Sequence, residues 1–307
     1  MNIGDKYILA YDNFQQLLDV LRVSNYQIIG PTVRDDAIVY DEICSISELP
    51  SGYTDEQDGG KYRLKKRNDS ALFGYVVGPH SWKKFLHPPV MSLWKAEKIG
   101  EDLKIIKEKE DIKKYAFIGV RSCELHAMAI QDKVFIEGEY VEPSYKLRRE
   151  NAFIVAVNCT QAGGTCFCVS MDTGPKARFG FDIALTEVLE SNSHYFVVEI
   201  GTEAGAEILS QITYGYAEDE KKEKAEELVM KAKNQMGREM DTTDIKELLY
   251  RNYESPVWEN VADRCLSCAN CTMVCPTCFC TTVEDTTDLT GKHAERVRKW
   301  DSCFTMD

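Results

Sequence analysis

The chain is short of positive charge and of long apolar runs. Lys and Arg number 37 against 50 Asp and Glu, which gives a formal net charge of −13. This excess of acid disfavours binding to nucleic acid or to an anionic membrane. No apolar run approaches the roughly 18 residues of a membrane-spanning helix, and residues 1–6 lack the basic-then-apolar start of a secretory signal. We therefore expect a cytoplasmic chain that binds neither nucleic acid nor membrane.

The sequence also lacks the common signatures of nucleotide binding and nucleophilic catalysis. It has no G-x-G-x-x-G fingerprint, no Walker loop and no serine or cysteine nucleophile motif. Cysteine, by contrast, is abundant, at 12 residues in 307. In a reducing compartment cysteines stay as thiols, which favours metal binding over disulfides. The cysteines are therefore the residues that are most indicative of function.

One cysteine run near the C-terminus has the spacing of a ferredoxin. Cys265, Cys268, Cys271 and Cys275 are followed by Pro276, in the pattern C-x2-C-x2-C-x3-C-P that holds 4Fe-4S clusters. Two-residue gaps let one loop reach three iron corners of a cluster, whereas the fourth cysteine turns towards a different cluster. Structural zinc sites usually pair two C-x2-C arms across a long gap. The spacing therefore favours a 4Fe-4S cluster over a zinc knuckle.

The N-terminal two thirds of the chain predict an α/β domain with a mostly parallel sheet. Apolar strands are expected at 115–120 and 152–157, on either side of a helix at 122–135. Other segments fit strands, helices or a loop: strands at 26–30, 37–43, 72–78, 183–189 and 195–200, helices at 14–21 and 203–212, and a polar surface loop at 50–66. We expect this domain to cover residues 1–216, a helical linker to cover 217–254, and a ferredoxin-like α-helical 4Fe-4S domain to cover 255–307.

A second set of cysteines falls at the strand ends of the α/β domain. Cys123 follows the first strand of the strand–helix–strand unit, Cys159 follows the second, and Cys166 and Cys168 come soon after Gly163-Gly164. The carboxyl ends of parallel strands share one edge of the sheet, where ligands collect. We hypothesise that these four cysteines hold a further 4Fe-4S cluster; the alternative is four unconnected structural cysteines.

Several stretches of the chain carry a family resemblance. They are Gly119–Ala127 (GVRSCELHA), Gln131–Phe135 (QDKVF), Arg148–Glu150 (RRE), Cys166–Pro175 (CFCVSMDTGP), Cys265–Cys280 (CLSCANCTMVCPTCFC) and Trp300–Cys303 (WDSC). On these stretches the chain resembles the beta, or iron–sulfur, subunit of cytoplasmic sulfhydrogenases, which are nickel–iron hydrogenases that also reduce sulfur. It is similar, less closely, to one of the subunits of anaerobic sulfite reductase.

The resemblance implies a subunit with no active site of its own. Such a subunit passes electrons between a flavin subunit that uses NAD(P) and a nickel–iron hydrogenase, or a sulfur- or sulfite-reducing catalytic subunit. Two other interpretations remain open. The α/β domain could itself bind a flavin or deazaflavin, or the cysteines could form a zinc-stabilised scaffold.

The chain departs from the family pattern at its C-terminus. Family members usually continue past the WDSC element to a second C-x2-C-x2-C-x3-C-P run, which does not follow here. If Cys275 serves another cluster, the cluster on Cys265, Cys268 and Cys271 needs a fourth ligand. The sequence leaves three sources open: a truncated second run, a run supplied by a partner, or one of Cys278, Cys280 and Cys303.

Overall fold

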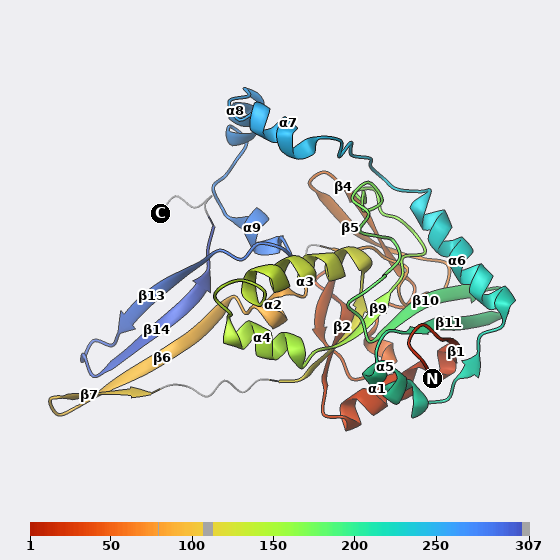
Figure 1. Cartoon of the computed structure of the whole chain (residues 1–307), viewed down its shortest axis with the longest axis horizontal. Coiled ribbons are helices and arrows are strands. Elements are labelled where there is room, and N and C mark those ends of the chain that lie inside the picture. Colours follow the sequence, from red (N-terminus) through yellow and green to blue (C-terminus); the bar gives the residue numbers. More distant parts are fainter. Residues whose placement is uncertain (79, 107–112, 303–307) are drawn as a thin grey trace. The chain divides into compact units, whose positions relative to one another are not determined.

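The computed structural model describes residues 1–78, 80–106 and 113–302 (Figure 1). The chain forms two compact units, each assembled from three separate segments. The first unit comprises Met1–Ser81, Lys113–Ile130 and Leu147–Thr242, and the second comprises Trp82–Ile112, Gln131–Lys146 and Thr243–Asp307. The division at 216 and 254 that the sequence suggests stays a prediction.

The first unit is built on an eight-stranded sheet. In spatial order its strands are β12 (Gly215–Tyr216), β1 (Lys6–Ala10), β11 (Ser193–Ile200), β10 (Ile183–Glu190), β9 (Phe153–Val157), β8 (Tyr115–Val120), β2 (Gln27–Arg34) and β3 (Ala37–Glu42). The pairs β10–β9, β9–β8 and β8–β2 are parallel, and the other pairs are antiparallel. The sheet is therefore mixed, and the prediction of a mostly parallel sheet is wrong. The short turn between β10 and β11 explains part of the error, because a tight turn can join only antiparallel strands.

Helices cover both faces of this sheet. Helix α1 (Phe14–Val23) and helix α5 (Glu203–Ser210) pack with Phe196 and Val198 of β11 in one apolar cluster. The alternate residues Tyr195 and Val197 pack on the opposite face against α6 (Asp219–Lys233), which Figure 1 shows alongside β10 and β11. Because successive side chains of a strand point to opposite faces, β11 is the middle of three layers.

The strand–helix–strand unit predicted from the sequence is confirmed. Strand β8 leads into α3 (Ser122–Phe135), and α4 (Pro143–Glu150) precedes β9, which pairs parallel to β8. Every residue of β9 is buried, as is typical of a central parallel strand covered on both faces. The sheet edge where β8 and β9 end is therefore a fixed platform.

Two segments of the first unit differ from the sequence prediction. Residues 50–66 contain the hairpin of β4 (Tyr53–Asp58) and β5 (Lys61–Lys66), not a surface loop, and the glycine pair between these strands is a turn signal. Residues 72–78 form no strand, although they are apolar and mostly buried. Instead of a ladder, the carboxylate of Glu187 accepts hydrogen bonds from the backbone N–H groups of Leu72 and Phe73, at 2.7 and 2.8 Å.

The second unit is built on a four-stranded antiparallel sheet. Its strand order is β13 (Thr281–Thr287), β14 (His293–Trp300), β6 (Val90–Ile99) and β7 (Asp102–Ile106). Its helices are short: α2 (Lys83–Leu86), α7 (Ile245–Arg251), α8 (Val257–Ala262) and α9 (Asn270–Val274). The predicted α-helical C-terminal domain is therefore wrong, because the β-branched stretch after Cys280 pairs with β14 instead of forming a helix.

The short 3-10 turns of the first unit are Tyr11–Asn13 and Ile46–Glu48. Among the residues that the structure describes, no helix combines the length and apolar character needed to cross a bilayer.

We predict that Phe196→Ala destabilises the first unit by about 3–5 kcal/mol, the usual result of emptying a buried aromatic site. Phe196 is fully buried, and its ring centroid lies 5.0 Å from that of Phe14. Denaturant unfolding of the two variants measures the effect. Val23→Ala is the control, because Val23 is 87% exposed at the end of α1, and it should change the unfolding free energy by less than about 0.5 kcal/mol. Equal effects of the two substitutions would contradict the prediction.

Candidate iron–sulfur sites

The first cysteine set lies at the carboxyl edge of β8 and β9. Cys123 is the second residue of α3, directly after β8, and Cys159 follows β9 by two residues. Because β8 and β9 are parallel neighbours, their carboxyl ends meet at one edge. The backbone N–H of Cys159 donates to the carbonyl of Pro175 at 3.1 Å, which ties the loop after β9 back on itself. The predicted placement of Cys123 and Cys159 at one sheet edge is confirmed.

The loop after Cys159 folds closely enough to require its glycines. A Cβ added at Gly163 would lie 2.6 Å from a methyl carbon of Val76, and one at Gly164 would collide with the carbonyl oxygen of Gln57. The backbone N–H of Gly163 donates to Sγ of Cys166 at 3.4 Å. The two glycines thus bring the loop against residues 57 and 76 and fix the sulfur of Cys166.

A later segment, residues 236–238, covers the same loop. Sδ of Met236 lies 3.8 Å from Sγ of Cys168, and the backbone N–H of Arg238 donates to the carbonyl of Cys166 at 2.9 Å. A Cβ at Gly237 would collide with the backbone of Gly163 and Gly164. Sequence reasoning missed these three residues, because no motif marks a contact between segments some 70 positions apart.

The four thiols share one electrostatic neighbourhood. Burial raises the pKa of Cys123 well above its ordinary value, with further increases from Glu124 and the other three thiols. Burial likewise raises the pKa of Cys168 to about 11, reinforced by Cys159 and Cys166. A thiolate raises the pKa of another thiol only when the two lie near each other. The fold therefore gathers Cys123, Cys159, Cys166 and Cys168, which come from separate segments.

These four residues fit a 4Fe-4S cluster in donor type and number, since such a cluster takes four thiolates. No group of three or more His, Cys, Asp or Glu side chains within the described ranges is arranged to hold a single metal ion. A cubane makes a different demand, because it offers a separate iron corner to each thiolate. Beside the thiols, Nε of Arg121 and the hydroxyl of Tyr75 are buried and have no hydrogen-bond partner among the described residues. A buried cation suits an anionic cluster.

The C-terminal run presents its first three cysteines on an exposed loop. Cys265, Cys268 and Cys271 are all exposed. Ser267 and Ala269, on either side of Cys268, have φ angles of 51° and 57°. Side chains other than glycine rarely adopt this left-handed conformation, which is often found at functional sites. The two turns reverse the chain direction around Cys268, as a loop wrapped around a cluster requires.

The next three cysteines, Cys275, Cys278 and Cys280, lie together beside a buried lysine. Burial raises the pKa of Cys278 to about 11, with further contributions from Cys275. Burial opposes ionisation of Cys275 as well, but hydrogen bonds from Thr277 and Cys278 hold the pKa of Cys275 below its ordinary value. The predicted candidate Cys303 lies outside the described residues.

The lysine is Lys83, which sequence reasoning missed. Its Nζ donates to the carbonyl of Thr272 at 3.0 Å and lies 4.0 Å from the ring centroid of Trp300. Burial lowers the pKa of Lys83, and the nearby Cys278, Cys275 and Cys280 oppose that change. The ammonium therefore faces the three thiols. Nothing in the local sequence distinguishes Lys83 from its exposed neighbours.

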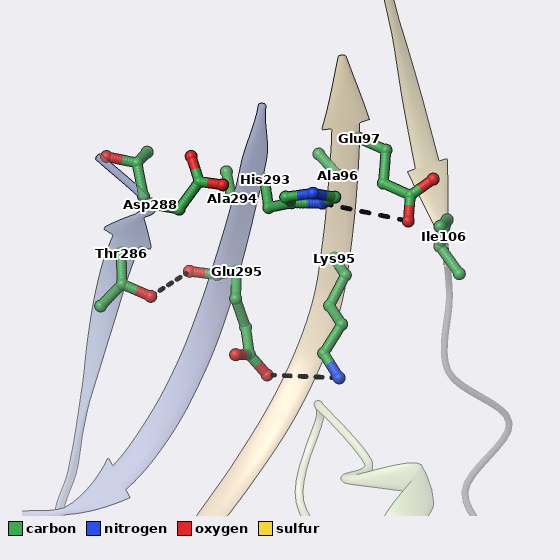
Figure 2. Close-up of a pocket in the computed structure, with 10 residues that line it drawn as sticks. Lys95, Ala96, Glu97, Ile106, Thr286, Asp288, His293, Ala294 and Glu295 are labelled. Carbon is green, nitrogen blue, oxygen red and sulfur yellow. Dashed lines mark hydrogen bonds and ion pairs between the residues drawn. The ribbon is translucent and has the colours of Figure 1, made fainter. Parts of the chain in front are cut away.

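A pocket of about 330 Å³ lies on the four-stranded sheet of the second unit (Figure 2). Its charged side chains pair with one another: Nζ of Lys95 lies 3.9 Å from Glu295, and Nδ1 of His293 lies 4.0 Å from Glu97. Asp288 accepts hydrogen bonds from Thr290 and from the backbone of Lys292. The residues lining this pocket thus include no thiol and no converging set of unmatched charges, and the pocket supports no catalytic role.

Comparison with known proteins connects the cysteine run to a family. A family model described as a 4Fe-4S dicluster domain matches residues 264–307. The chain is 30% identical over 293 residues to Sulfhydrogenase 2 subunit beta of Pyrococcus furiosus, an alignment that covers 95% of this chain and 76% of the relative. No solved structure matches the chain. The prediction of 4Fe-4S clusters is confirmed for the C-terminal part, while the individual ligands stay predictions.

We predict that the metal-free chain loses stability at alkaline pH. The pKa values of Cys123, Cys159, Cys166 and Cys168 are all raised by folding, so the folded state holds these protons more tightly than the unfolded state. This contribution is complete below the ordinary thiol pKa of 9.0 and is lost as the pH rises, through about 11 for Cys168.

The melting temperature of chelator-treated protein, followed by circular dichroism across this pH range, measures the loss. Cys168→Ala removes one titrating group and should flatten the decline. An identical decline in the variant would show that other groups cause it.

Proposed function

We propose, because the chain belongs to the family of sulfhydrogenase beta subunits, that it relays electrons within a cytoplasmic, multi-subunit oxidoreductase complex. One side of the relay exchanges electrons with a subunit that binds flavin and NAD(P). The other side exchanges electrons with a nickel–iron hydrogenase subunit or with a subunit that reduces sulfur or sulfite. The protein itself carries no catalytic residue in this proposal.

A single observation carries the proposal: the cysteine run from Cys265 to Cys275 falls within the match to a 4Fe-4S dicluster domain. When bound, a 4Fe-4S cluster accepts and releases one electron at a time. The chain's own residues hold the sulfur ligands, limit the access of water and set the local charge. All of these influence the ease of electron transfer.

We assign the ligands in two groups. In the second unit Cys265, Cys268 and Cys271 hold one cluster, and Cys275 serves the dicluster domain as a further ligand. The missing fourth ligand comes from Cys278, Cys280 or Cys303, or from a second cysteine run. The exposure of Cys265, Cys268 and Cys271 places this group where a partner's redox centre can approach it.

In the first unit Cys123, Cys159, Cys166 and Cys168 hold a further cluster. Support comes from their meeting at one sheet edge and from the close cover that residues 236–238 provide. Burial of this set contrasts with exposure of the first three C-terminal cysteines. The two groups therefore suit different positions in a relay, one internal and one at the surface of its own unit.

We predict that Cys268→Ala abolishes nicotinamide-coupled turnover by the purified complex. The activity of the catalytic partner with an artificial dye should persist, because the dye bypasses the relay. Cys44→Ala is the matched control, since Cys44 is also an exposed free thiol but belongs to neither cysteine group. Loss of both activities in Cys268→Ala, with the complex intact, would contradict a relay role.

We predict that Cys159→Ala lowers the iron content by up to four atoms per chain, the number in one 4Fe-4S cluster. Anaerobic purification followed by iron and labile-sulfide analysis measures this, with Cys44→Ala again as the control. An unchanged iron count would remove the cluster from the first unit. Zinc in place of iron and sulfide would support a scaffold instead, and a yellow chromophore released by acid would support flavin binding.

A further inference from the structure

Arg121 is a charged side chain in a fully buried position. It lies between the last residue of β8 and the first residue of α3, and only 1% of its surface is exposed. Arginine is almost never buried to this extent without partners, because removing a guanidinium from water is costly. The contacts of Arg121 therefore have to account for its position.

Rigid backbone holds the guanidinium on one side. Nη2 donates to the carbonyl oxygens of Phe73 and Tyr75, both at 2.9 Å. The guanidinium carbon lies 4.8 Å from the centroid of the Tyr75 ring, which is a cation–π distance. These contacts leave the side chain little freedom to move.

The other side of the guanidinium faces the cysteine set. Nη1 donates to Sγ of Cys159 at 3.9 Å, and Nε has no hydrogen-bond partner among the residues that the structure describes. The contacts with backbone carbonyls thus orient the charged group so that it reaches a sulfur atom. The remaining donor is buried and available on the same planar group.

Two acidic side chains lie in the same region. Glu124 is buried, and its carboxylate accepts hydrogen bonds from the backbone N–H of Arg121 and from the hydroxyl of Tyr40, both at 2.8 Å. Asp55 accepts a hydrogen bond from the backbone N–H of Val76 at 2.8 Å, and it interacts electrostatically with Arg121. Without the guanidinium, four thiolates would therefore face carboxylates in a poorly solvated site.

We propose that Arg121 raises the reduction potential of the cluster held by Cys123, Cys159, Cys166 and Cys168, through its buried positive charge and its N–H···S hydrogen bond to Cys159. This inference rests on the proposed function, in that the four thiols hold a 4Fe-4S cluster. Reduction adds one negative charge to the cluster, and a fixed cation stabilises that charge. Hydrogen bonds to the sulfurs and net charge are established determinants of cluster potential.

The test is a redox titration of the intact complex, followed by the paramagnetic signal of the reduced cluster. The relevant signal is the one that disappears in Cys159→Ala. In Arg121→Met the equilibrium constant for reduction at a given potential should fall at least tenfold, which for one electron is about 59 mV. Arg121→Lys keeps the charge but cannot make all three contacts, so its midpoint should fall between those of Arg121→Met and the unchanged protein.

Arg67→Met is the control for disorder of residues 72–76. Arg67 donates to the carbonyl of Gly74 in the same segment, and its other hydrogen bonds go to Asp69 and Gln161. This variant should leave the midpoint unchanged. An equal shift in Arg67→Met would show that the segment's position, and not the Arg121 charge, sets the potential.

The outcomes separate this inference from the proposed function. If Cys159→Ala loses no iron, the cluster assignment itself fails. If Cys159→Ala loses iron but Arg121→Lys, with full iron content, keeps the original midpoint, only the role of Arg121 is overturned. Should Arg121→Met bind no iron, the midpoint of Arg121→Lys decides the question alone.

Discussion

Buried charges that bind backbone groups are the interaction on which the first unit depends. Residues 72–76 lie inside the protein without a strand ladder, yet their polar groups have partners: Glu187 accepts from two backbone N–H groups, and Asp55 accepts from a third. Arg121 donates to two carbonyls of the same segment. Unpaired backbone groups would be costly in this position. The same network places Val76 against Gly163, so it also forms a wall of the thiol site.

Each unit combines thiols with one buried cation. In the first unit Arg121 reaches Cys159, and in the second Lys83 faces Cys275, Cys278 and Cys280. The chain as a whole has a net charge of −13, so these cations run against its general character. Charges interact more strongly in a buried, low-dielectric site than at the surface. A single buried cation can therefore outweigh many distant surface acids in setting the local field at an iron–sulfur centre.

Local patterns in the sequence were sufficient for the parts of the structure that local physics determines. The β8–α3–β9 unit and the cysteine run were predictable, because apolar period and ligand spacing are properties of adjacent residues. The mixed character of the large sheet was not, since it depends on which distant strands pair. The same reason hides Arg121: its importance comes from the carbonyls of residues 73 and 75, some 46 positions away. The hairpin after Cys280 was missed because cysteine spacing dominated the interpretation of its β-branched neighbours.

The contact of Gly237 with Gly163 and Gly164 has a consequence for the order in which the protein is made. The loop that carries Cys166 and Cys168 is synthesised long before the segment that covers it. A nascent chain that ends before Gly237 has all four sulfur ligands of the first unit but lacks one side of their enclosure. Metal delivered at that stage would meet an open, solvent-accessible loop, and the arrival of α6 and the residues after it would close it.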